Sequence, residues 1–186
     1  MKQVLAAGIV MLLLCGCGSG EEGIGQALAL RSSLLEGNGC SFETTITADY
    51  GDATYSFSMD CVSDTEGILE FTVTAPESIA GITGQLASEE GKLTFGETVL
   101  AFELLAEDQI SPVSAPWILL KTLRGGYIAS CTREEACWKL AIDDSFEEDA
   151  LRLDIWLDEE NRPVYADILY DGRRIVSMEV ENFTFG

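Results

Sequence analysis

The chain has 186 residues, with 11 basic and 32 acidic side chains, a formal net charge of −21 and no histidine. Such an acidic chain repels phosphate backbones, so we expect no nucleic-acid partner. The absence of histidine excludes histidine bases, Ser-His-Asp triads and histidine metal ligands. Phosphate-loop and nucleophile-elbow motifs are missing. The acidic clusters at 143–149 and 158–160 lack the spacing of a calcium loop and have the composition of solvated turns. We therefore expect no enzymatic activity, no cofactor and no metal.

The first residues predict an export signal. A lysine at position 2 precedes the apolar run Val4–Leu14, which is too short for a membrane-spanning helix of about 20 residues. A positive tip, a short apolar core and small residues after it are typical of a secretory signal. Cys17 directly follows a glycine, which resembles the lipobox of bacterial lipoproteins, whereas Cys15 follows a leucine and fits poorly. The alternative is a plain secretory signal with incidental cysteines.

The lipobox predicts a division of the chain. We expect residues 1–16 to be removed as a lipoprotein signal peptide, and Cys17 to receive a diacylglyceryl group that palmitate labels. Residues 17–25 would form a flexible tether, and residues 26–186 a single domain. Two acyl chains on one cysteine are enough for stable anchoring. The protein would then be extracytoplasmic and held at the cell membrane through Cys17.

The hydrophobic pattern is first helical and then alternates. Helical spacing predicts a helix over 25–36, ended by Gly37-Asn38-Gly39. Period-two alternation then predicts strands at 40–50, 55–61, 69–74, 93–95 and 100–104, with a weaker candidate at 81–88.

Four further cysteines lie in the exported part, and they are Cys40, Cys61, Cys131 and Cys137. Export makes them disulfide candidates, and four cysteines allow three pairings. Cys40 and Cys61 share the parity of the apolar residues in two runs that flank a Gly-Asp turn, which favours a Cys40–Cys61 bridge worth roughly 3 kcal/mol. Cys131 and Cys137 would then clamp the connection between them. Reduced, buried thiols are the competing interpretation.

A second helix is predicted between Ser111 and Gly126, with Ser114 as its cap and Pro116 in its first turn. Its apolar face predicts a helix that covers the core, and a lid or plug over an apolar cavity is the minority alternative. Alternation then resumes at 138–143, 151–158, 164–170 and 175–185, with Asp171-Gly172 as a tight hairpin signal. Short turns between these strands indicate an antiparallel meander.

This pattern resembles the LolA/LolB lipoprotein-carrier fold, whose relatives include RseB-like regulators and LppX/LprG-type lipoproteins. The most suggestive stretch is the paired-hairpin ending LRLDIWLDEENRPVYADILYDGRRIVSMEVENF. The resemblance implies a mainly β (α+β) fold, in which a curled, incomplete antiparallel barrel of about eleven strands has helices on its concave side. It also implies a hydrophobic concave surface. Candidate lining residues, each of which could equally be simple core, are Phe42, Ile46, Phe57, Met59, Phe71, Phe95, Phe102, Trp117, Leu120, Leu153 and Ile155.

Two functions follow. The first is a membrane-anchored lipoprotein that binds a hydrophobic ligand, either a lipid or the acyl chain of a lipoprotein, in the concave cavity. The alternative is a non-enzymatic, membrane-tethered adaptor that docks onto a cell-envelope protein and stabilises or regulates it. Its contact patch would be the acidic strand around 147–158, with Trp156 exposed among charges, although a solvated sheet face explains the same residues.

Overall fold

The computed structural model describes residues 19–51, 53–87, 90–95, 98–103, 105–106, 109–147 and 150–186, so the expected signal peptide, Cys15 and Cys17 lie outside the described residues. The first half contains α2 (Ser19–Glu36), β1 (Cys40–Asp49), β2 (Thr54–Ser63), β3 (Leu69–Ala75), β4 (Thr83–Ala87), β5 (Glu90–Phe95) and β6 (Thr98–Glu103). The second half contains β7 (Leu105–Ala106), β8 (Gln109–Ile110), the 3-10 turn η1 (Pro112–Ser114), α3 (Ala115–Gly125), β9 (Tyr127–Glu134), β10 (Cys137–Asp143), β11 (Arg152–Leu157), β12 (Pro163–Tyr170) and β13 (Arg173–Phe185).

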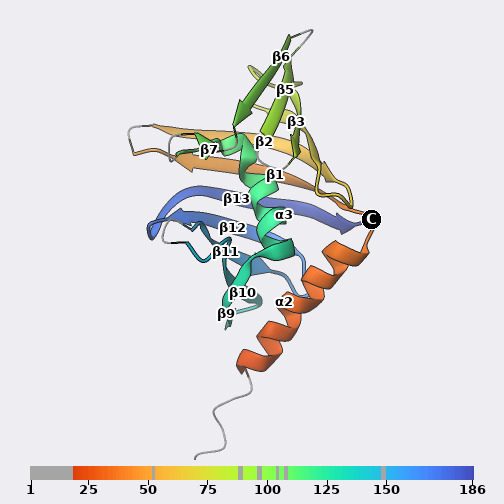
Figure 1. Cartoon of the computed structure of the whole chain (residues 1–186), viewed down its shortest axis with the longest axis vertical. Helices are drawn as coiled ribbons and strands as arrows, with labels where there is room; N and C mark the ends of the chain where they lie inside the picture. Colours follow the sequence, from red (N-terminus) through yellow and green to blue (C-terminus); the bar gives the residue numbers. More distant parts are fainter. Residues whose placement is uncertain are drawn as a thin grey trace, which may run out of the picture.

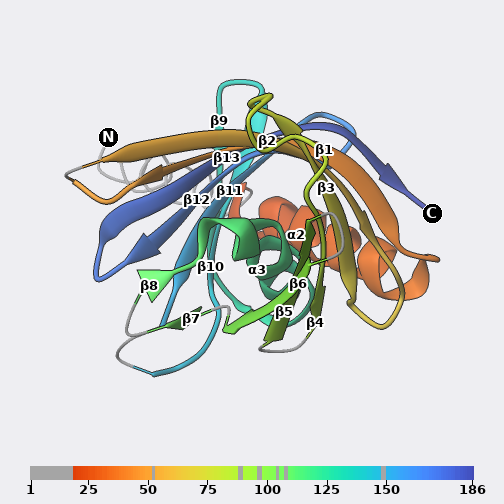
Figure 2. The same ribbon diagram turned by 90° about the horizontal axis from the view of Figure 1, so that it is seen from above.

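The strands form one curled, unclosed sheet. Within the described ranges it has eleven strands in the order β6-β5-β4-β3-β2-β1-β13-β12-β11-β10-β9, and every neighbouring pair is antiparallel. Strands β6 and β9 are therefore its two edges. Figure 2 shows the sheet curving around α2 and α3, which lie on its concave side. The mainly β, incomplete barrel expected from the sequence is confirmed.

Alternation along the strands produces this shape. In β3 and β11 every second side chain is buried, and the buried ones are Leu69, Phe71, Val73, Leu153, Ile155 and Leu157. Because neighbouring side chains of a strand point to opposite faces, these residues line the concave face and the polar ones face water. The hairpin between β12 and β13 turns at Asp171 and Gly172, whose φ angles of 48° and 72° are those of a type I′ turn.

Helix α2 begins at Ser19, inside the segment for which the sequence predicts a flexible tether. One of its glycines, Gly23, has a packing role. A β-carbon on Gly23 would lie 2.5 Å from the Cys131 sulfur and 3.0 Å from the Trp138 ring, so glycine lets the helix lie directly on β9 and β10. Among the described residues, no helix is both long and apolar enough to cross a bilayer.

Helix α3 differs from expectation at its start. Pro116 lies in the first turn as predicted, but the hydroxyl of Ser114 does not cap the helix. It donates instead to the carbonyl of Ser111 at 2.6 Å, because the preceding residues already form the 3-10 turn η1. The helix therefore continues a turn that begins earlier in the chain.

Strand β9 has no counterpart in the sequence prediction. It is an edge strand, and of its eight residues only Cys131 is buried. Without a buried face, no hydrophobic alternation arises for a pattern search to find. The weak strand candidate at 81–88, by contrast, is confirmed as β4.

Candidate functional site: the apolar concave face and the polar face behind it

The predicted lining residues gather on the concave face. The sheet residues among them that belong to the hydrophobic core are Phe42, Ile46, Phe57, Met59, Phe71, Leu153 and Ile155. Leu120 and Trp117 lie on α3 itself, where Leu120 belongs to the same core and Trp117 packs against it. The side chains of Phe95 and Phe102 lie outside the described residues. Ile46, Met59, Leu153 and Ile155 have no exposed surface. In this structure these residues belong to the covered core, which was the alternative interpretation.

Helix α3 provides that cover. Its buried residues include the aliphatic side chains Ile118, Leu119, Leu120 and Leu123. Thr122 is only 1% exposed on the same helix, and its hydroxyl has no hydrogen-bond partner among the described residues. An unsatisfied buried hydroxyl costs about 1–3 kcal/mol. Thr122 is thus a buried polar group among the aliphatic side chains of α3.

Two arginines fix the C-terminal end of α3. From α2, Arg31 donates through Nε to the carbonyl of Leu123 at 2.8 Å and through Nη2 to the carbonyl of Gly126 at 2.7 Å. Burial lowers the pKa of Arg31 from its ordinary value. Arg124 donates to the carbonyl of Asp64 at 2.8 Å, next to the end of β2. The two Arg31 bonds satisfy carbonyls at the end of α3 and tie it to α2, and the Arg124 bond ties it to the segment after β2.

The four cysteines are free thiols in this structure. Cys40 lies opposite Ser63, and Cys61 lies opposite Phe42. The two sulfurs therefore share a face, as predicted, but stand diagonally, where Cα atoms are about 7–8 Å apart and beyond the usual disulfide range. Burial raises the pKa of Cys40 to about 11 and raises the pKa of Cys61 as well. The geometry favours buried, reduced thiols, which was the competing interpretation.

The predicted clamp between Cys131 and Cys137 is wrong for a reason of register. Cys131 pairs with Leu140, which lies three residues beyond Cys137 on β10. An odd offset places two side chains on opposite faces of a sheet. Cys131 accordingly lies buried beneath α2, and Cys137 is half-buried on the outer side.

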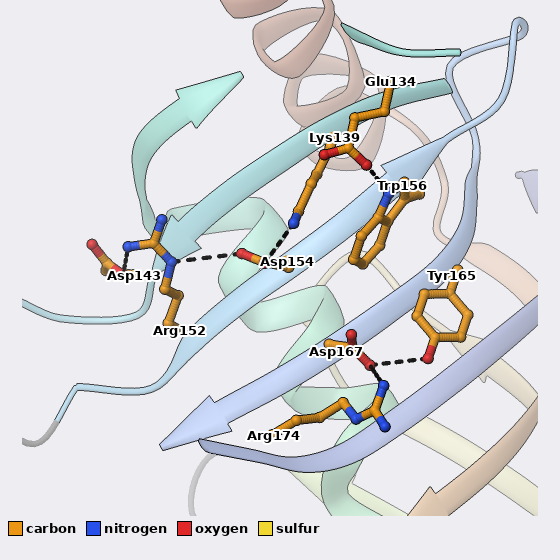
Figure 3. A network of polar contacts seen from close by, with 9 residues as sticks. All are labelled: Glu134, Lys139, Asp143, Arg152, Asp154, Trp156, Tyr165, Asp167 and Arg174. Atoms are coloured by element: carbon orange, nitrogen blue, oxygen red, sulfur yellow. Dashed lines mark hydrogen bonds and ion pairs between the residues drawn. The ribbon is translucent and has the colours of Figure 1, made fainter. Parts of the chain in front are cut away.

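The outer face of β9–β13 carries a network of polar contacts (Figure 3). Trp156 was expected to be exposed, but it is half-buried and donates through Nε1 to Glu134 at 3.0 Å. The Lys139 ammonium lies 4.6 Å from the centre of the Trp156 ring and 2.9 Å from Asp154. Tyr165 meets the same ring edge-on at 5.3 Å. Cross-strand partners thus cover the tryptophan proposed as a contact residue.

The network continues through Asp167. Its carboxylate accepts from the Tyr165 hydroxyl at 3.0 Å and lies 3.7 Å from Arg174. Burial raises the pKa of Asp167, against the opposing effects of Tyr165 and Arg174. Arg152 bridges Asp154 and Asp143 at 3.5 and 3.9 Å. Asp154, at the centre of β11, is therefore paired with cations of its own sheet.

A polar groove, which the sequence interpretation missed, lies on the outer face of β2–β5. Its volume is about 520 Å³, and its lining includes Asp60, Glu70, Thr72, Gln85 and Lys92. These residues occupy the outward positions of their strands in matching register. The outward parity could have been read from the sequence, but the hollow results from the twist of the sheet.

No family model and no curated protein matches this chain. Solved structures similar to it include the LolA superfamily protein NE2245 from Nitrosomonas europaea, at 8% identity over 91% of this chain and 94% of that one, with a TM-score of 0.45. A putative outer membrane lipoprotein-sorting protein domain from Vibrio parahaemolyticus has 12% identity over 89% and 92%, with a TM-score of 0.47. The Mycobacterium tuberculosis lipoprotein LppX has 10% identity over 87% and 93%, with a TM-score of 0.42. Solved structures similar to this chain thus include a protein of the LolA superfamily, whose fold the sequence resembles.

Proposed function

We propose that this chain is an extracytoplasmic lipoprotein, anchored to the membrane through acyl chains on Cys17, that holds a hydrophobic ligand on its concave face. The ligand is a lipid or the acyl chain of another lipoprotein, and no catalysis is involved. Residues 1–16 would be its signal peptide. The observation that carries the proposal is the continuous apolar surface of an open sheet, covered by the short helix α3.

Helix α3 occupies the place that the ligand would take. Four fully buried aliphatic side chains on α3 contribute about 1.5–3 kcal/mol each, or about 6–12 kcal/mol together. An acyl chain gains about 0.8 kcal/mol for each buried methylene, so about ten methylenes give about 8 kcal/mol. The two terms are of the same size. A ligand can therefore replace part of the α3 contact.

The anchor has a direct test. Metabolic labelling with palmitate should mark the wild-type chain and the Cys15→Ser variant, whereas Cys17→Ser should lose the label. Loss of label in Cys15→Ser instead would show that the acylated residue has been placed wrongly.

The tethered adaptor remains the second candidate, and the complete burial of Ile46, Met59, Leu153 and Ile155 favours it. A titration of the delipidated full-length chain with a fluorescent fatty acid separates the two functions. Saturable binding near one molecule per chain supports the carrier. Absence of binding, together with specific capture of an envelope protein, supports the adaptor and refutes the carrier.

A further inference from the structure

Helix α2 has two different apolar sides. Its inner side buries Ala27, Leu30 and Leu34, which contact the core. Its outer side presents Ile24, Leu28 and Leu35, which are 48%, 52% and 60% exposed. Residues four and seven apart lie on one line along a helix, so these three form a single stripe, called here the outer stripe. Figure 1 shows α2 at the periphery of the molecule, with its outer side uncovered by any labelled element.

The chain outside the described residues leads directly to this helix. Cys17 stands two positions before Ser19, the first residue of α2. Because one residue spans at most about 3.6 Å, the two Cα atoms lie within about 7 Å of each other. Ile24 follows about 7.5 Å further along the helix. A diacylated Cys17 would therefore hold the start of the outer stripe in the headgroup zone of the bilayer.

Charge decides what kind of surface the outer stripe can meet. Glu22 and Glu36 are exposed near the two ends of the helix, and the whole chain has a net charge of −21. Anionic headgroups would repel this surface, so insertion must be driven by apolar contact. We propose that the outer stripe of α2 lies in the interface of the membrane that holds the anchor, and so fixes the orientation of the domain. This inference rests on the proposed acylation of Cys17.

A photo-cross-linking experiment tests it. The full-length chain is purified from its host, its acyl group is verified by mass, and it is reconstituted into phosphatidylcholine vesicles that contain a phospholipid with a diazirine on its acyl chain. Adducts mapped by mass spectrometry should be at least about fivefold more frequent on residues 24–35 than on Val62, as expected for an inserted helix face. Val62 is a matched control, because it is 58% exposed on the outer face of β2.

Salt and substitutions sharpen the result. Adducts on the outer stripe should persist in about 0.5 M salt, where exposed charges are screened within a few ångströms. The triple variant Ile24→Gln, Leu28→Gln, Leu35→Gln should lose them, whereas Val62→Gln should keep them. All four side chains are exposed, so circular dichroism should show the same fold in both variants.

Several outcomes would overturn the inference. An acylated chain with equal labelling of the outer stripe and Val62 contradicts it. Adducts confined to concave residues such as Ile46 and Met59 support the proposed ligand site and overturn this inference alone. A native chain that lacks an acyl group on Cys17 overturns both the membrane anchor and the membrane-facing helix.

Discussion

Helix α2 packs closely on the sheet because residue 23 is a glycine and has no β-carbon. Replacing Gly23 by alanine would place a β-carbon 2.5 Å from the sulfur of Cys131 and 2.9 Å from its β-carbon. Alanine gains up to about 1 kcal/mol of helix propensity over glycine. Overpacking a well-filled contact costs about 1–3 kcal/mol. We expect Gly23→Ala to lower the free energy of unfolding by about 1 kcal/mol on balance.

Gly25 is the matched control in the same helix. A β-carbon there would meet nothing within 4 Å, so Gly25→Ala should raise the free energy of unfolding by up to about 1 kcal/mol. Urea denaturation of the full-length chain under reducing conditions measures both values. Adding Cys131→Ala to Gly23→Ala removes the nearest clashing atom and should restore part of the loss. If Gly23→Ala stabilised the chain as much as Gly25→Ala, the packing of α2 described above would be incorrect.

Three further predictions concern α3, the thiols and the outer network. Arg31→Gln removes two hydrogen bonds to carbonyls at the end of α3 and should speed fatty-acid uptake, whereas Arg173→Gln, at an exposed position, should not. Equal uptake rates in the two variants would exclude a role for the contact between Arg31 and α3. Burial raises the pKa of Cys40 from 9.0 to about 11. Because the unfolded chain loses this proton more readily, the stability that the Cys40 thiol contributes is complete below pH 9 and is lost as the pH rises towards 11. The free energy of unfolding should fall by about 2–3 kcal/mol between pH 8 and pH 11, as measured by urea denaturation. Cys40→Ala should reduce this fall, and the same fall in the variant would contradict the role given to Cys40. Lys139→Met removes the ion pair with Asp154 and should cost about 1–2 kcal/mol of unfolding free energy, because both partners are mostly buried; a change below about 0.3 kcal/mol would contradict this.

The interior of the sheet could be predicted from the sequence because its alternation is a local signal. The inward residues of β3 and β11 are apolar, and so are those of β1 except Thr44, whose buried hydroxyl donates to the carbonyl of Glu179. The turn at Asp171-Gly172 was recognisable by itself. Edge strand β9 could not be predicted, because it buries almost nothing of its own.

Features that depend on contacts between distant segments could also not be predicted from the sequence. The glycines at the start of α2 are typical of a tether, but Gly23 contacts Cys131 of β9, more than a hundred residues further along the chain. The faces of Cys131 and Cys137 follow from a register that only the paired strands define. Trp156 is covered by Lys139 and Tyr165 from its two neighbouring strands, which a single-strand pattern cannot show.

Native mass spectrometry of the chain purified from its host membranes tests the central claim most directly. The account predicts two additions to the mature chain, a diacylglyceryl group on Cys17 that survives denaturation and a second hydrophobic molecule that denaturation releases. A mature chain that carries the anchor alone, and that binds no added fatty acid, would contradict a ligand on the concave face.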